Sequence, residues 1–235
     1  MVQRWADVVF LHWSFPPDVV QRQLPAGVRV DTFADAAWVG LVPFAMEGLG
    51  VPGLAPLPFV GSFPEVNVRT YVRAGGHRGV WFFSLDVNRI LPVVVARATY
   101  HLPYCFARAN HERVGNVVTS GVDRRWPGPT ATTHVAVRTG RRVEPGDRFV
   151  EFLTARWGLV SATRRGRLRY APIDHPEWPL HDAELLGLDD RLVAAAGLPS
   201  PTESPHVLWS PGVDVRVGRP RRLPPTSERA RQPPH

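Results

Sequence analysis

The most regular pattern in the chain is an alternation of polar and apolar residues from Phe63 to Arg73. A period of two is typical of a β-strand, because successive side chains of a strand point to opposite faces. A Gly75-Gly76 pair follows, and a second strand-like segment runs from Gly79 to Val87. Two such segments joined by two glycines predict a β-hairpin. We therefore expect a fold built on antiparallel sheet.

Strand patterns continue along most of the chain, whereas helical patterns are few and short. The expected strands cover residues 8–13, 28–33, 37–46, 103–109, 114–122, 131–138, 157–173 (folded at Arg165-Gly166) and 206–217. The expected helices start at Pro17 and cover 92–101, 147–156 and 189–196. Many short strands with few helices predict an α+β fold that is mostly antiparallel β, either a sheet or a barrel.

The C-terminal end differs in composition from the rest. Residues 216–235 hold six arginines and one acid, with five prolines between Pro220 and Pro234. Such a segment cannot bury enough apolar surface to offset its ordering entropy. We expect one folded domain over 1–217 and a disordered basic tail over 218–235. The other 22 basic and 20 acidic residues leave a net charge of only +2, so no nucleic-acid-binding face is expected.

The residue types that are missing exclude several classes of chemistry. The chain contains no lysine, and a guanidinium is no amine nucleophile, so no side chain can form a Schiff base. The single cysteine, Cys105, excludes an internal disulfide. No run approaches the ~18 apolar residues of a membrane span, and the N-terminus lacks the apolar region of a signal peptide. We expect a cytoplasmic protein without a membrane partner.

Known cofactor and metal motifs are not supported. The segment from Gly48 to Gly53 matches the dinucleotide pattern GxGxxG, but Pro52, Pro56 and Pro58 forbid the helix that this motif must open. The histidines show no metal-ligand spacing, and no Gly-x-Ser-x-Gly elbow is present. We therefore expect no cofactor and no metal.

One face of the 63–73 strand carries a concentrated set of polar groups. Glu65, Asn67, Arg69 and Tyr71 share this face. The pattern alone favours a solvated strand face. The alternative is the interior of a barrel, where these groups would converge on one ligand. In that case a buried Glu65–Arg69 pair would keep the acid ionised and leave donors free for a carboxylate or carbonyl.

Two further segments supply candidate site residues. Arg97 follows an apolar run, and a buried position there would need a partner; an exposed helix face is the equal alternative. The segment from His175 to Pro179 is a proline-bounded loop that presents an imidazole, a carboxylate and the indole of Trp178. Packing of Trp178 into the core is favoured there over a site role, although functional groups often lie on loops.

Several blocks together resemble the family named domain of unknown function 2071, over about residues 1–217. The blocks are Pro43-Phe44, Phe63-x-Glu65-x-Asn67-Val68-Arg69-Thr70-Tyr71-Val72, Gly79-Val-Trp-Phe-Phe-Ser-Leu-Asp86, Ala96-Arg97 with Tyr100 and Leu102-Pro103-Tyr104, Phe152-Leu153-Thr154-x-Arg156 and His175-x-x-Trp178-Pro179-Leu180. That family is similar to the acetoacetate decarboxylase superfamily. The resemblance implies a partly open antiparallel β-barrel around a small-molecule pocket, with a few short helices.

The resemblance to the decarboxylases carries over only in part. Their Schiff-base lysine lies in a Pro-Lys-Lys run, and the corresponding stretch here, Leu91 to Val95, has valines in place of both lysines. Glu65 is similar to the conserved pocket glutamate of the decarboxylases. The resemblance therefore implies the scaffold and an acidic pocket, but not the imine mechanism.

Two classes of function are left, beside a purely structural role. The first is binding of a small carboxylate or carbonyl compound, with Arg69 and Arg97 as anion clamps and further contacts from Asn67, Tyr71, His175 and Trp178. The second is an imine-independent enzyme of lyase or isomerase type, in which Glu65 is the general acid or base and Arg97 or Arg69 stabilises an oxyanion. Binding is favoured because no nucleophile or metal set is visible. The sequence does not predict the ligand or the oligomeric state.

Overall fold

The computed structural model describes residues 1–50, 61–90 and 97–224. In these residues the helices are α1 (Pro17–Gln21), α3 (Arg148–Thr154) and α4 (Leu192–Ala195), and most of the regular structure is β-strand. The strands are β1 (Val2–Phe15), β2 (Arg29–Val30), β3 (Thr32–Phe33), β4 (Ala36–Gly50), β5 (Phe63–Ala74), β6 (His77–Val87), β7 (Tyr104–Val114), β8 (Val117–Trp126), β9 (Thr132–Arg142), β10 (Gly158–Ala162), β11 (Leu168–Asp174), β12 (His181–Asp190), β13 (His206–Val217) and β14 (Arg221–Arg222).

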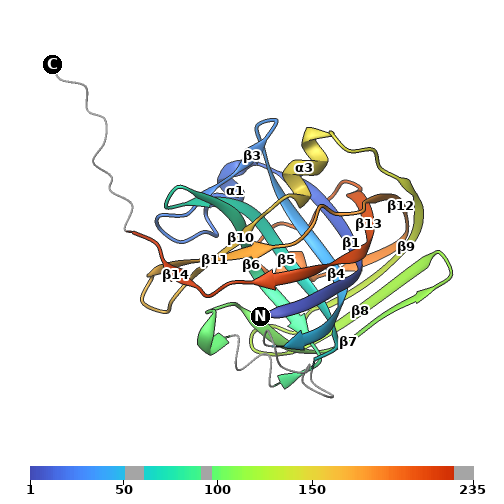
Figure 1. The fold of residues 1–235 in the computed structure, drawn as a ribbon, viewed down its shortest axis with the longest axis horizontal. Helices are drawn as coiled ribbons and strands as arrows, with labels where there is room; N and C mark the ends of the chain where they lie inside the picture. The colour runs from blue at the N-terminus through green and yellow to red at the C-terminus, as the bar shows by residue number, and fades with distance from the viewer. Residues whose placement is uncertain (51–60, 91–96, 225–235) are drawn as a thin grey trace.

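All strands belong to one sheet that closes on itself (Figure 1). Its order is β14-β11-β10-β6-β7-β8-β9-β12-β13-β1-β4-β5-β2, with β3 paired to β4. Additional pairings of β6 with β5 and of β11 with β13 close two circuits, which share β13, β1, β4, β5 and β6. Among the strand pairs of the described residues, only β10–β6 and β6–β7 are parallel. The mostly antiparallel prediction is confirmed, but the sheet forms a ring with two circuits rather than one true barrel.

The central hairpin forms where the alternating pattern predicts it. β5 and β6 pair antiparallel up to Ala74 opposite His77. Gly75 and Gly76 between them have φ angles of 54° and 80°. A two-residue turn with both residues at positive φ matches the right-handed twist of the strands, and glycine adopts it without steric cost.

Both faces of β5 are buried because β5 belongs to both circuits of the ring. Val66 and Val68 pack into the main apolar core. On the opposite face, Glu65, Asn67 and Arg69 are only 2%, 4% and 8% exposed. The solvated strand face, which the pattern alone favoured, is therefore wrong.

The helices match the prediction unevenly. α3 lies inside the predicted 147–156 segment, and the Asp147 carboxylate caps it by accepting from the backbone N–H groups of Phe149 and Val150. α4 is shorter than predicted, because the chain before it forms the unpredicted strand β12. A register shift between Leu185 and Gly187 interrupts the alternation of β12, so the sequence pattern conceals this strand. No helix in the described part of the chain is long and apolar enough to cross a membrane.

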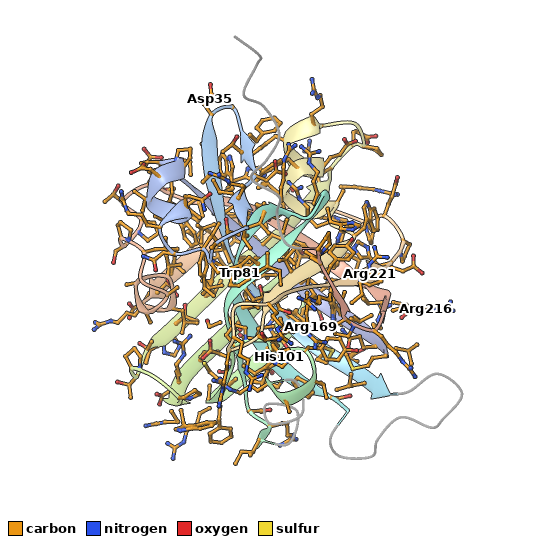
Figure 2. All side chains as sticks on the ribbon, turned by 90° about the vertical axis from the view of Figure 1, so that its left-hand side faces the viewer. Asp35, Trp81, His101, Arg169, Arg216 and Arg221 are labelled. Atoms are coloured by element: carbon orange, nitrogen blue, oxygen red, sulfur yellow. The ribbon has the colours of Figure 1, made fainter. Side chains whose placement is uncertain are left out.

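The chain stays packed beyond Val217, where we expected the folded domain to end. β14 pairs with β11, and Leu223 is 4% exposed in a cluster with Val72 and Tyr170. Figure 2 shows Arg169 and Arg221 at this edge of the sheet. Backbone pairing of β14 with β11 and burial of Leu223 together hold this Pro/Arg-rich segment on the sheet. Residues 225–235 of the predicted tail, the Leu91–Val95 stretch, residues 92–96 of the predicted 92–101 helix and residues 51–53 of the segment from Gly48 to Gly53 lie outside the described residues.

Candidate functional site

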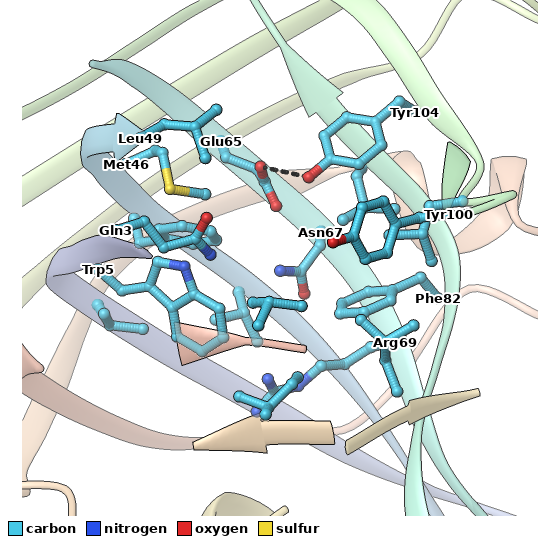
Figure 3. Close-up of a pocket in the computed structure, with 18 of the residues that line it drawn as sticks. Gln3, Trp5, Met46, Leu49, Glu65, Asn67, Arg69, Phe82, Tyr100 and Tyr104 are labelled. Carbon is cyan, nitrogen blue, oxygen red and sulfur yellow. Dashed lines mark hydrogen bonds between the residues drawn. The ribbon is translucent and has the colours of Figure 1, made fainter. Parts of the chain in front are cut away.

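A cavity of about 130 Å³ lies inside the ring, between β1, β4, β5 and β6. Its walls are mainly apolar and aromatic, with Phe10, Phe44, Phe63, Phe82 and Leu85 among the lining residues. Glu65, Asn67 and Arg69 line it from β5, and Figure 3 shows all three directed into it. The volume is far above the ~15 Å³ that one water needs. The strand alternation therefore places three polar groups in a mainly apolar cavity.

Glu65 is a buried carboxyl group without a cationic partner. Burial raises its pKa to about 8, hydrogen bonds from Tyr104 and Asn67 lower it in part, and the charge of Asp86 raises it. The Tyr104 hydroxyl donates to Glu65 Oε2 at 3.3 Å. At neutral pH Glu65 is therefore mainly protonated, and it can donate a hydrogen bond into the cavity.

Arg69 does not pair with Glu65, so the ion pair proposed from the sequence is wrong. The two residues are four positions apart on one strand, which separates their Cα atoms by about 13 Å. The Arg69 guanidinium lies instead 5.5 Å from the Phe10 ring centroid and donates to the Leu153 carbonyl at 3.4 Å. No ion pair with Arg69 occurs among the described residues. Its positive charge is therefore buried without a counter-ion.

Three buried polar atoms of cavity-lining residues have no hydrogen-bond partner. They are Trp5 Nε1, Asn67 Oδ1 and Arg69 Nε. An unsatisfied buried donor or acceptor costs about 1–3 kcal/mol. Two donors and one acceptor of residues that line one cavity are therefore without a partner among the described residues.

Tyr71 and His12 form a layer behind the cavity wall. The Tyr71 hydroxyl donates to the Leu153 carbonyl at 2.6 Å and lies 2.6 Å from His12 Nε2. Both residues are buried and neither lines the cavity. Burial, assisted by the charge of Arg69, holds the pKa of His12 well below its usual value, so the imidazole is neutral. Tyr71 shares the strand face of Glu65, but it supports the wall rather than contacting the cavity.

Arg97 and His175 also lie outside the cavity. Arg97 donates to the backbone carbonyl of Tyr104, and its guanidinium lies 5.8 Å from the Trp126 ring centroid. Arg97, which we predicted to be an anion clamp, therefore binds the backbone carbonyl of Tyr104 instead. His175 packs against Trp157 and Trp178, with ring centroids 4.5 and 5.1 Å apart.

Trp178 itself lines the cavity and stacks on Trp5 at 6.0 Å between ring centroids. The core role and the site role weighed for this loop therefore coincide in one residue. Trp178 packs against the rings of Trp5 and His175, and it also lines the cavity.

Several groups that shape the site were not predicted from the sequence. Asp86 accepts two hydrogen bonds from Arg124, at 2.6 and 2.7 Å, and both residues are buried. The charge of Asp86 acts on Glu65 and raises the pKa of the Glu65 carboxyl group. A lone acid in the apolar run of β6 was the available signal for Asp86. Trp5 and Tyr104 enter the cavity from β1 and β7, and no local pattern could have linked them to β5.

Thiol and metal chemistry receive no support from the described residues. Burial, with a further contribution from Asp86, raises the pKa of Cys105 to about 11, so its thiol stays protonated at neutral pH. No three His, Cys, Asp or Glu side chains within residues 1–50, 61–90 and 97–224 are grouped to hold a metal ion.

The fold is that of the acetoacetate decarboxylase-like proteins. The acetoacetate decarboxylase of Legionella pneumophila superposes with a TM-score of 0.68 at 12% identity, covering 95% of this chain and 88% of that one. The enduracididine biosynthesis enzyme MppR, in complex with the condensation product of pyruvate and imidazole 4-carboxaldehyde, gives 0.66 at 16% identity, covering 96% and 90%. An acetoacetate decarboxylase-like enzyme of Sphingomonas wittichii gives 0.63 at 14%, covering 95% and 92%.

Within this class, the chain belongs to the DUF2071 family of uncharacterised conserved proteins, which it matches over residues 2–214. The uncharacterised protein YqjF of Bacillus subtilis (strain 168) is 33% identical to it over 217 residues, covering 92% of this chain and 89% of YqjF. The family resemblance stated from the sequence is confirmed.

Proposed function

We propose that this protein binds a small carboxylate or carbonyl compound in the cavity, without forming a covalent imine. The observation that carries this proposal is the set of three buried, unpartnered polar atoms on Trp5, Asn67 and Arg69. A mostly apolar pocket with a few convergent polar groups is the usual form of a small-molecule site.

The charge of Arg69 supports an anionic ligand. A buried charge without a partner is strongly unfavourable. A carboxylate would supply the missing negative charge and accept from the free Nε–H of Arg69, since guanidinium–carboxylate hydrogen bonds are among the strongest in proteins. The neutral Glu65 does not compete for this charge.

The structural relatives support the same class of ligand. MppR has been captured with pyruvate and with a pyruvate condensation product, and pyruvate is both a carboxylate and a carbonyl compound. The identity to MppR is only 15–16%, and this chain has no lysine. We therefore propose the same type of ligand, a carboxylate or carbonyl compound, but no covalent step.

Thermal unfolding with pyruvate and with acetoacetate tests the proposal. A ligand at one hundred times its Kd stabilises the folded state by about 2.7 kcal/mol, or about 5–10 °C in Tm for a domain of this size. We expect such a shift for the wild type and its loss in Arg69→Met. Arg97→Met, which changes an arginine outside the cavity, is the control and should keep the shift. A shift that survives Arg69→Met, or its absence for both compounds, contradicts the proposal.

The alternative function, an imine-independent enzyme, is favoured by one specific observation. The pKa of Glu65 is raised by burial to about 8, and a catalytic acid or base works best with a pKa near the working pH. The test is exchange of the methyl protons of pyruvate in D2O, followed by NMR. Exchange that requires protein and disappears in Glu65→Gln, while the binding shift persists, would favour catalysis over binding alone.

A further inference from the structure

The two ionisable side chains that line the cavity from β5, Glu65 and Arg69, lie at separate ends of it. Alternate side chains on one strand face are about 6.6 Å apart, so Asn67 lies midway between Glu65 and Arg69, whose Cα atoms are about 13 Å apart. Figure 3 shows Glu65 and Arg69 on opposite sides of Asn67, with apolar and aromatic side chains around them. A ligand that reaches both ends must be elongated.

The Arg69 end is suited to a carboxylate. Arg69 is the only Lys, Arg or His side chain among the described residues that line the cavity. Its guanidinium is held against the rings of Phe10 and Tyr71 at 5.5 and 5.8 Å, and its Nε–H has no partner. This end therefore provides one fixed positive charge with a free donor.

The Glu65 end provides neutral donors and no basic side chain among the described lining residues. The Trp5 ring lies 5.7 Å from that of Phe44, and the Phe44 backbone pairs with Glu65, which places the free indole N–H at this end. A second carboxylate there would meet no basic side chain among the described residues that line the cavity, and burial of its charge without such a partner is strongly unfavourable. A neutral carbonyl oxygen could instead accept from Trp5 and from the protonated carboxyl of Glu65.

We infer that the cavity selects elongated monocarboxylates, with the carboxylate at Arg69 and a neutral carbonyl group, separated from it by an apolar spacer, at Glu65 and Trp5. This inference rests on the proposed function and names its class of ligand. An extended chain advances about 1.2 Å per bond. We take a spacer of five bonds, about 6 Å long, because it is about half of the 13 Å between the two Cα atoms and leaves room for the side chains and a hydrogen bond at each end.

Calorimetric titration with four probes at pH 6.5 tests the inference on the unmodified protein. The probes are 6-oxoheptanoate, heptanoate, heptanedioate and pyruvate. We expect 6-oxoheptanoate to bind at least ten-fold more tightly than heptanedioate and pyruvate, and about five-fold more tightly than heptanoate, which has the same length but no carbonyl. This order follows from one cation at one end and neutral donors at the other.

Two variants separate the indole N–H from the bulk of the aromatic wall. Trp5→Phe removes the donor and should reduce the affinity for 6-oxoheptanoate about five-fold more than the affinity for heptanoate. Trp178→Phe, a matched change in a second ring that lines the cavity, should reduce both affinities by the same factor.

The outcomes distinguish this inference from the proposed function. Equal affinity for pyruvate and 6-oxoheptanoate, or equal affinity for the oxo acid and the dicarboxylate, overturns the inference and leaves the proposed function in place. If none of the four probes binds to the folded wild type, the inference and the proposed function are both contradicted. An identical response of the two ligands to Trp5→Phe also overturns the placement of the carbonyl at Trp5.

Discussion

At the scale of single residues, the site depends on two ionisable groups of one strand with different environments. Glu65 and Arg69 share a face of β5 but lie too far apart to neutralise each other. Each therefore responds to burial separately. The carboxyl group takes up a proton, whereas the guanidinium of arginine stays charged in proteins. The result is a neutral acid and an uncompensated cation in one cavity.

The raised pKa of Glu65 predicts a specific pH dependence of stability. The unfolded chain loses this proton near pH 4.3 and the folded protein near pH 8, so the folded state binds more protons between them. The free energy of unfolding should therefore fall as the pH rises through this window, by up to roughly 5 kcal/mol. Glu65→Gln removes this contribution. Urea denaturation at pH 5, 6.5 and 8 should give a flatter profile for the variant, and parallel profiles would contradict the assignment.

Removal of the Tyr104 hydroxyl should raise the pKa of Glu65 further. The phenol donates to the carboxyl group and lowers its pKa in part. Carbon-13 NMR titration of the Glu65 carboxyl should therefore show a higher midpoint in Tyr104→Phe than in the wild type. Tyr100→Phe is the matched control, because Tyr100 lines the same cavity but its hydroxyl contacts the Gly218 carbonyl instead. The same midpoint in all three proteins would show that the hydrogen bond does not act on the acid.

At the scale of elements, the short edge strand β14 holds the Pro/Arg-rich end of the described chain on the sheet by pairing with β11. Leu223 is buried against β5 and β11 side chains, and its backbone N–H donates to the Leu168 carbonyl. Its side chain also occupies the space above Gly75, where an added Cβ would lie 3.1 Å from a Leu223 methyl carbon. The glycine turn of the central hairpin and the end of the described chain therefore pack together.

Leu223→Ala should destabilise the protein although it changes a segment of disorder-like composition. Deletion of a buried leucine side chain costs about 2–3 kcal/mol or more, which is about 4–10 °C in Tm for a domain of this size. Arg222→Ala, at the exposed neighbouring position, should change the stability by less than about 0.5 kcal/mol. Calorimetric melting of both variants tests this difference. Equal Tm values for Leu223→Ala and the wild type would mean that β14 is not docked in solution.

At the scale of the whole molecule, the ring of sheet and the absence of lysine act together. The cavity lies inside the ring, and the chain offers it no side-chain amine. Polar recognition therefore has to come from arginine, amide, indole and carboxyl groups. None of these groups forms an imine with a carbonyl compound under ordinary conditions.

Borohydride trapping tests this consequence across the entire chain. Incubation with acetoacetate or pyruvate followed by borohydride should leave every side chain unmodified, because no lysine amine is present. Peptide mass spectrometry locates any adduct. A reduced adduct mapped to a side chain would contradict the non-covalent mode of binding, and a lysine-containing decarboxylase treated in parallel confirms that the trapping works.

The sequence by itself determined the elements whose causes are local. The alternation from Phe63 to Arg73 specified β5, Gly75-Gly76 specified its turn, and Asp147 marked the start of α3. It also determined that an imine is excluded, since this follows from residue types alone. Local patterns suffice here because strand alternation, glycine turns and helix caps act over a few residues.

Only the tertiary structure decided which polar residues form the site. Period two placed Tyr71 with Glu65, yet the closure of the ring left Tyr71 behind the wall and brought in Trp5 and Tyr104 from distant strands. It also decided that Glu65 is neutral and that Arg97 supports a backbone carbonyl. Burial and long-range contacts depend on how the strands close around the cavity, and the free energy of a charged group depends on that environment rather than on its neighbours in sequence.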